Sequence, residues 1–73
     1  MKINIVGKTM SGVPVNIVKR LREMDFGDTI DIDGYINRIS EHLGFDISGD
    51  TIEDRCENFL KESAKNGWAE MVE

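Results

Sequence analysis

The sequence predicts an α+β fold in which three helices pack on a small two- or three-stranded sheet. Residues 2–6 alternate polar and apolar side chains, three later stretches space their apolar residues as helices do, and residues 68–72 again favour a strand. The predicted order is β-α-(β)-α-α-β. Because the chain has 73 residues and neither an internal repeat nor a linker, we expect a single compact domain over residues 1–73.

The N-terminal third predicts a strand, a loop and a helix. The strand covers residues 2–6, and a glycine-bounded loop follows at residues 7–12. The helix runs roughly from Pro14 to Met24, because proline is tolerated in a first helical turn, where its missing N–H has no partner. A turn at Gly27 is expected to end it. Its expected buried face carries Val13, Ile17, Leu21 and Met24, with Val18 on the flank.

The middle of the chain predicts a second helix and leaves one short segment open. Residues 29–32 alternate, and they fit either a short edge strand or the lead-in to the next helix. Asp33 is an acceptable N-cap, the helix covers residues 34–43, and Gly44 ends it. A turn over residues 44–49 leads to the third helix.

Residues 50–66 form the clearest predicted helix. Asp50 and Glu53 have the spacing of a capping box, and Gly67 suits the left-handed conformation that ends many helices. Trp68 follows and is expected to fold back onto the last turn. The apolar stripe of the helix carries Ile52, Cys56, Phe59, Leu60 and Ala64. The expected core of the domain is Ile3, Ile5, Ile17, Leu21, Ile36, Ile39, Leu43, Ile52, Cys56, Phe59, Leu60 and Trp68.

Charge is distributed unevenly along the chain, whose formal net charge is −5. Residues 1–24 carry five basic side chains and one acidic one, whereas residues 25–73 carry four basic and thirteen acidic ones. Such asymmetry indicates two surfaces of opposite sign. The basic patch, which could bind an anion or a nucleic acid, consists of Lys2, Lys8, Lys19, Arg20 and Arg22. The acidic face of the third helix, which could bind a protein, consists of Glu53, Asp54, Glu57 and Lys61.

Each motif that could carry chemistry lacks a required part. Gly-Lys-Thr at residues 7–9 follows a strand but lacks the earlier glycine of a phosphate-binding loop. Asp31 and Asp33 fit the middle of a calcium-binding EF-hand loop whose first and last carboxylates are missing here. His42 has no second histidine with which to share a metal. We therefore expect no metal, no cofactor and no enzymatic activity.

Cysteine usage and hydropathy predict the cellular compartment. Cys56 is the single cysteine and lies on an apolar stripe, so a buried structural thiol is expected, with a reactive or intermolecular cysteine as the alternative. No apolar run is long enough to span a bilayer, and the N-terminus lacks the pattern of a signal peptide. These features predict a cytoplasmic protein that does not enter a membrane.

The second half of the chain resembles a winged helix-turn-helix domain. Helix 34–43, a turn and helix 50–66 are followed by strand 68–72, and the latter helix ends with Lys61, Lys65, Asn66 and Gly67. The resemblance covers about half the chain and implies nucleic-acid binding through the second of these helices. This helix departs from the family, because it carries five acidic side chains against three basic ones, whereas a phosphate backbone requires clustered lysine and arginine.

Two functions are consistent with these patterns. The first is a small, acidic, non-enzymatic protein-interaction module, with a protein partner or a second copy in a homodimer. The alternative is a winged-helix-like nucleic-acid-binding regulator that uses the basic first helix.

Overall fold

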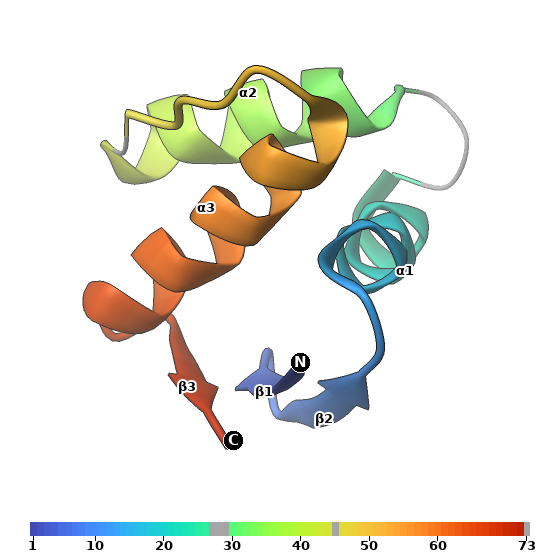
Figure 1. Cartoon of the computed structure of the whole chain (residues 1–73), viewed down its shortest axis with the longest axis vertical. Coiled ribbons are helices and arrows are strands. Elements are labelled where there is room, and N and C mark those ends of the chain that lie inside the picture. Colours follow the sequence, from blue (N-terminus) through green and yellow to red (C-terminus); the bar gives the residue numbers. More distant parts are fainter. Residues whose placement is uncertain (27–29, 45, 73) are drawn as a thin grey trace.

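The computed structural model describes residues 1–26, 30–44 and 46–72. Within them, three helices lie against one side of a three-stranded antiparallel sheet, which confirms the predicted α+β class (Figure 1). The observed order is β-β-α-α-α-β, and the prediction lacked the second of these strands. The elements are β1 (Lys2–Ile5), β2 (Lys8–Ser11), α1 (Pro14–Phe26), α2 (Ile32–Leu43), α3 (Ile52–Lys65) and β3 (Ala69–Met71).

The central strand of the sheet is β1, since the strand order is β2-β1-β3. It pairs antiparallel with both neighbours, and Ile3 lies opposite Met10 on one side and Met71 on the other. Ile3 and Met10 are buried, whereas Asn4, which alternates with Ile3, is exposed. One face of the sheet therefore covers the core and the other is polar and faces outward.

Residues 8–11 form a strand where a loop was expected. The two-residue turn Val6-Gly7 joins β1 to β2, and its residues have positive φ angles of 49° and 76°. Such a turn matches the twist of the flanking strands, but it normally begins with Asn, Asp or Gly. The loop prediction was wrong because a valine occupies the first turn position and only one residue of β2 is apolar.

The first helix, α1, reaches Phe26 and is longer than predicted. Val13 and Met24 were expected on its buried face, but both are exposed. α1 packs against both α2 and α3, so its buried stripe is centred nearer to Val18 than predicted. The expected turn at Gly27 lies outside the described residues. The side chains that α1 buries are Ile17, Val18 and Leu21.

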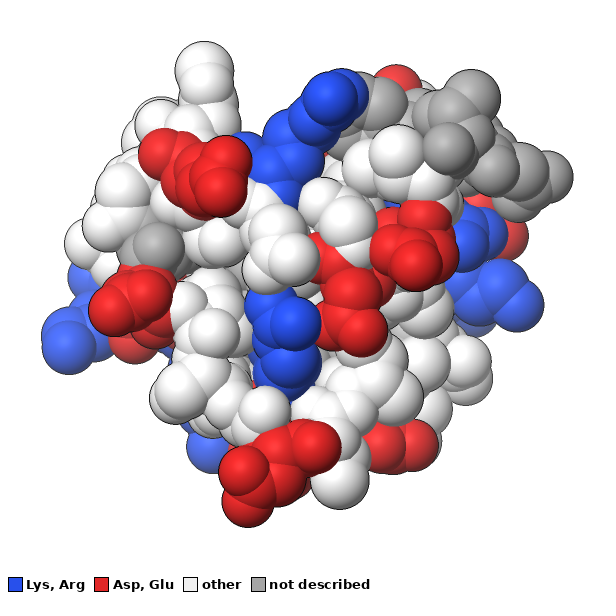
Figure 2. Space-filling view, turned by 90° about the horizontal axis from the view of Figure 1, so that it is seen from above, with Lys and Arg blue, Asp and Glu red and all other residues white. Residues whose placement is uncertain are grey.

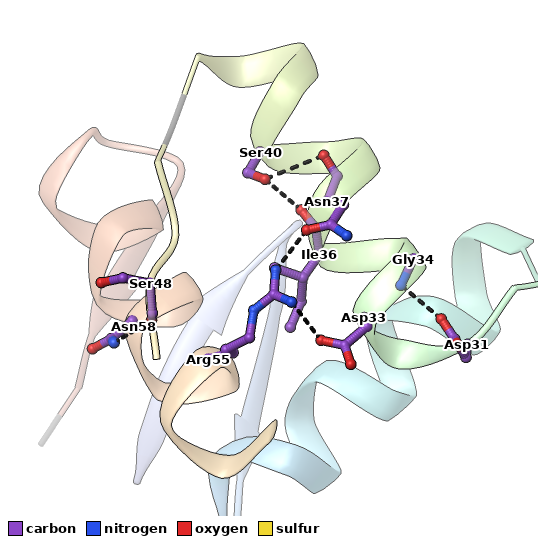
Figure 3. Close-up of polar contacts among 9 residues, drawn as sticks. All are labelled: Asp31, Asp33, Gly34, Ile36, Asn37, Ser40, Ser48, Arg55 and Asn58. Carbon is purple, nitrogen blue, oxygen red and sulfur yellow. Dashed lines mark hydrogen bonds and ion pairs between the residues drawn. The ribbon is translucent and has the colours of Figure 1, made fainter. Parts of the chain in front are cut away.

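The second helix, α2, begins at Ile32 because Asp31 caps it. The Gly34 N–H donates to Asp31 Oδ1 at 2.7 Å (Figure 3). The prediction that Asp33 is the N-cap was wrong, since Asp33 lies in the first turn of the helix.

The segment before α2 does not add a strand to the sheet. Residues 30–31 are not in a strand and Ile32 is helical, so the alternative of a lead-in to the helix is correct for them. Thr29, the first residue of that segment, lies outside the described residues. Gly44 ends α2 in a left-handed conformation, as predicted.

The third helix, α3, contacts α1, α2 and β3, and it lies between α2 and the sheet with α1 beside it (Figure 1). Thr51 caps its N-terminus, because the Asp54 N–H donates to Thr51 Oγ1 at 3.1 Å. The predicted capping box of Asp50 and Glu53 was wrong by one residue. Thr51 is the better-placed cap because its extended backbone comes directly before the first helical residue.

At the C-terminal end of α3 the backbone adopts the predicted helix-ending conformation, but the Trp68 side chain does not lie in the core. Gly67 has a φ angle of 82°, its N–H donates to the Ala64 carbonyl at 3.2 Å, and the Trp68 N–H donates to the Ser63 carbonyl at 2.8 Å. These two bonds form a Schellman motif, which ends a helix by satisfying its last carbonyls. The Trp68 side chain was expected in the core but is 56% exposed.

Most of the predicted core is buried between the helices and the sheet. Ile39, Leu43 and Ile52 are only half-buried, at the edge of the core. Met10, Val18 and Tyr35 belong to the core but were not predicted to, because the strand of Met10 and the buried faces of α1 and α2 depend on tertiary packing. The predicted core residues that are buried are Ile3, Ile5, Ile17, Leu21, Ile36, Cys56, Phe59 and Leu60.

Candidate functional site

A cavity of about 210 Å³ lies where all three helices meet the end of β1. Two largely exposed apolar side chains stand at its rim: Val6 is 63% exposed and Trp68 is 56% exposed. Val6 follows β1 directly and Trp68 precedes β3, so the pairing of these strands brings them to the same end of the sheet. The apolar walls come from Ile5, Leu21, Ile39, Leu43 and Phe59.

Polar side chains from each helix also line this cavity. Asp25 and His42 are exposed, whereas Tyr35 and Ser63 are buried. The Ser63 hydroxyl donates to the Phe59 carbonyl at 2.8 Å, within its own helix. The hydroxyl of Ser63 is therefore engaged by the backbone rather than directed to a ligand.

Tyr35 and Asp25 form the central polar contact of the cavity. The Tyr35 hydroxyl donates to Asp25 Oδ2 at 2.8 Å, and the Tyr35 ring makes an edge-on contact with Phe59 at a centroid distance of 6.1 Å. Burial, followed by the hydrogen bond to Asp25 and the charge of Asp25, raises the pKa of Tyr35 well above its usual range. Tyr35 therefore stays neutral and holds the carboxylate as a hydrogen-bond donor.

Asp25 has no ion-pair partner among the described residues. The pairs found there join Arg22 to Glu23 (3.8 Å), Arg55 to Asp33 (2.7 Å) and Lys61 to Glu57 (3.1 Å). Asp25 thus places a negative charge at the edge of an apolar cavity without a cation from the described part of the chain to balance it.

The structure brings part of the predicted basic patch together. Lys8 and Arg20 line one shallow groove between β2 and α1, together with Met10, Met24 and the acidic Glu23. The Arg22 side chain is only 14% exposed and pairs with Glu23. Lys19 is exposed on α1, and Lys2 is half-buried in the central strand, opposite Ser11.

The predicted acidic face lies on α3 and away from the cavity lining. Glu53 and Asp54 are exposed in the first turn, and Lys61 pairs with Glu57 one turn apart at 3.1 Å. Figure 2 looks down on α2 and the start of α3, and there acidic and basic side chains are interspersed with uncharged ones. On that view the described residues do not form a continuous acidic field.

The two aspartates considered for calcium have structural partners instead. Asp31 caps α2, and Asp33 accepts from Arg55 Nη1, while Arg55 Nη2 donates to Asn37 Oδ1 (Figure 3). Arg55 thereby ties α3 to the first two turns of α2. Among the described residues, no group of three or more potential ligands could hold a metal ion.

Cys56 is fully buried in the core. Burial, and then the charges of Asp33 and Glu53, raise the pKa of its thiol to about 11, whereas Arg55 acts in the opposite direction. The thiolate that would act as a nucleophile or metal ligand is therefore disfavoured at neutral pH.

Sequence reasoning did not identify the cavity. It ended the first helix near Met24, before Asp25, and placed Trp68 in the core. The residues that meet at the cavity come from the end of β1, from all three helices and from the segment before β3. Gly67 marks the end of α3 but does not indicate where the Trp68 side chain lies.

No protein-family model, curated protein or solved structure matches this chain. None of the helices in residues 1–26, 30–44 and 46–72 is long and apolar enough to span a membrane.

Proposed function

We propose that this chain is a non-enzymatic protein-interaction module that receives a large apolar side chain, flanked by a basic residue, from a partner protein. The observation that carries the proposal is the apolar cavity with Val6 and Trp68 exposed at its rim. Tryptophan is enriched among residues that dominate binding energy at protein interfaces. The cavity volume of about 210 Å³ is below the range of roughly 300–1,000 Å³ typical of pockets for drug-sized ligands, and so it suits a single side chain.

The absence of enzymatic activity is part of the proposal, and the engagement of the polar side chains supports it. Ser63 donates to a backbone carbonyl, Tyr35 donates to Asp25, and the thiol of Cys56 is buried and largely protonated. Nucleophilic catalysis requires a nucleophile within hydrogen-bond reach of a base. Ser63 and His42 share the cavity lining, but among the described residues the hydroxyl of Ser63 bonds to the backbone and not to His42.

The test uses Trp68, the single tryptophan, as a fluorescent reporter. A displayed library of short random peptides is selected on the wild-type protein, and the enriched sequences are synthesised and titrated. We expect them to share a large apolar residue next to lysine or arginine and to shift the Trp68 emission. Trp68→Ala, followed by anisotropy of the labelled peptides, is expected to weaken binding at least about tenfold, or about 1.4 kcal/mol.

The matched control is the charge reversal Glu53→Lys with Glu57→Lys on the acidic face of α3. We expect this control to change peptide affinity less than about threefold, mainly through the net charge. If the charge reversal abolishes binding and Trp68→Ala does not, the acidic face is the docking surface and the cavity proposal is wrong. A dimer in sedimentation equilibrium that Trp68→Ala dissociates would identify a second copy as the occupant.

Nucleic-acid binding is the second candidate, and one observation favours it. Lys8 and Arg20 line the same groove, as a patch that contacts phosphates would require. Glu23 in the same groove and the net charge of −5 oppose this function.

Anisotropy of a labelled DNA duplex from about 20 to 200 mM salt tests this candidate. Binding that weakens steeply with salt and is lost in Lys8→Glu with Arg20→Glu would establish it. Arg22 is not used as the test residue because its side chain is mostly buried. An unchanged anisotropy at the lowest salt concentration would exclude the candidate.

A further inference from the structure

We infer that Asp25 is a specificity-determining residue, which binds the cationic group of the occupant while the adjacent apolar group enters the cavity. This inference rests on the proposed function and names the contact that selects the partner. The cationic group belongs to a lysine or arginine that lies next to the apolar side chain in the partner protein.

The position of Asp25 at the edge of the cavity supports this inference. Asp25 is exposed at the C-terminal end of α1, whereas the neighbouring walls are formed by Leu21, Leu43 and Phe59. A cation beside Asp25 stays partly hydrated, and an attached hydrocarbon group can reach the apolar walls. Amphipathic side chains and amines bury their apolar part and keep their charge near water in this way.

The carboxylate of Asp25 is held in place and has an oxygen left for a ligand. Tyr35 donates to Oδ2 at 2.8 Å, and the remaining oxygen, Oδ1, has no hydrogen-bond partner among the described residues. The buried ring of Tyr35 packs edge-on against Phe59, so the hydroxyl that holds Asp25 is itself fixed. A pre-oriented carboxylate forms a charge-assisted hydrogen bond at a lower cost in side-chain entropy than a mobile one.

The electrostatics of the lining also favour a cation. Among the described residues that line the cavity, Asp25 is the single carboxylate, and His42 is the single basic side chain. The net charge of −5 adds a longer-range attraction for basic segments and a repulsion for acidic ones. The probes are titrated at about pH 8.

Three five-carbon probes that differ in charge test the apolar part and the charged part of the inference separately. They are n-pentylammonium, 1-pentanol and pentanoate, and each is titrated into the labelled protein while the Trp68 indole N–H and the backbone amides are followed by NMR. We expect pentylammonium to bind about three- to tenfold more tightly than pentanol, which is the range of about one ion pair at a partly exposed site. Pentanoate is expected to bind most weakly of the three.

The key variant is Asp25→Asn, which removes the charge but keeps an oxygen that can accept from Tyr35. We expect it to bind pentylammonium and pentanol equally well, with the affinity for pentanol unchanged. If Asp25→Asn does not fold, raising the salt concentration on the wild-type protein replaces it: salt is expected to weaken pentylammonium binding and to leave pentanol binding unchanged.

The outcomes distinguish this inference from the proposed function. Equal affinities of the wild-type protein for pentylammonium and pentanol overturn the role of Asp25 and leave the apolar cavity as the binding site. A preference for pentylammonium that persists in Asp25→Asn, or that resists salt, also overturns it. If none of the three probes shifts the signals of Trp68 and its neighbours, the cavity does not take an apolar group and the proposed function fails as well.

Discussion

Val6 is a β-branched residue with a φ angle of 49°, a left-handed conformation that valine rarely adopts. It occupies the first position of the turn between β1 and β2 and also stands at the rim of the cavity. Strained backbone positions of this kind cost on the order of 1–3 kcal/mol and are often found at functional sites. The proposed binding at the rim would account for an exposed apolar residue at this position despite its strain.

The strain predicts that Val6→Asn stabilises the protein. Asparagine tolerates the left-handed region and is preferred at this position of such turns, so the free energy of unfolding should rise by about 1 kcal/mol. Urea denaturation followed by Trp68 fluorescence measures it. Val72→Asn is the control, because Val72 is exposed without a positive φ angle, and it should change stability by less than about 0.5 kcal/mol. A neutral or destabilising Val6→Asn would show that the turn is not strained.

Cys56 predicts a loss of stability at alkaline pH. Its thiol pKa is about 11 in the folded protein, against an ordinary value of 9.0 for an exposed thiol. The contribution of the protonated Cys56 thiol to the free energy of unfolding is complete below pH 9. It is lost as the pH rises from 9 towards 11, because the thiol loses its proton at a lower pH in the unfolded chain than in the folded protein. The expected loss at pH 11 is on the order of 2 kcal/mol.

Urea denaturation at pH 8 and at pH 10.5 measures this effect. Cys56→Ala lowers stability at both pH values by leaving a small cavity, but its decline between them should be smaller than that of the wild-type protein. Tyr35, whose pKa is also raised, keeps part of the decline in the variant. An equal decline in both proteins would contradict the assignment to Cys56.

At the scale of elements, the connection from α2 to α3 is held by contacts close to the start of α3. Asn58 donates to the Ser48 carbonyl at 2.7 Å, and Arg55 bridges to Asp33 on α2 (Figure 3). Gly49 passes so close to Arg55 that a Cβ there would lie 2.8 Å from the Arg55 backbone nitrogen. The backbone path into α3 therefore requires glycine at this position.

Gly49→Ala is predicted to destabilise the protein by about 2 kcal/mol or more, because the clash is with backbone atoms that cannot move without disturbing the first turn of α3. Gly12→Ala is the matched control. Gly12 also has a positive φ angle, 131°, but a Cβ there would meet nothing within 4 Å, so its cost should be near 1 kcal/mol. Thermal unfolding by circular dichroism compares the two, and equal costs would show that the close approach to Arg55 is unimportant.

At the scale of the whole molecule, the cavity at the meeting point of the helices and the sheet leaves apolar side chains such as Ile39 and Leu43 only half-buried. A chain of 73 residues has a small core, so apolar surface left uncovered at this point is a cost in stability. Natural proteins commonly retain such destabilising features where function needs them. Stability and binding are therefore expected to change in opposite directions when the cavity is filled.

Leu43→Phe tests this relation. Leu43 is half-buried in the cavity wall, and the larger ring is expected to fill part of the space and to raise the free energy of unfolding by about 1 kcal/mol. The same change should weaken pentylammonium binding at least about tenfold, which NMR titration measures. Leu43→Ala, which enlarges the cavity, should lower stability instead. Unchanged binding in Leu43→Phe would place the ligand outside the cavity.

The sequence by itself determined the features that depend on local periodicity and local backbone chemistry. The 3.6-residue spacing from Ile52 to Leu60 identified α3, and Gly67 marked its end, because both signals come from neighbouring residues. The division of charge between the N-terminal third and the remainder was likewise readable without a structure. Helix caps were predicted less well, since both members of the pairs Asp31 and Asp33, and Asp50 and Thr51, are residue types that commonly cap helices.

Only the tertiary structure decided the second strand and the cavity. β2 carries a single buried side chain, Met10, and it becomes a strand because the turn at Val6 pairs it with β1. Trp68 is apolar enough for the core, but the Schellman motif and the pairing of β3 direct it to the rim. The contact of Tyr35 with Asp25 joins α1 to α2, and no sequence spacing encodes it. These features are set by packing between distant segments of the chain, and a periodic pattern within one segment does not predict that packing.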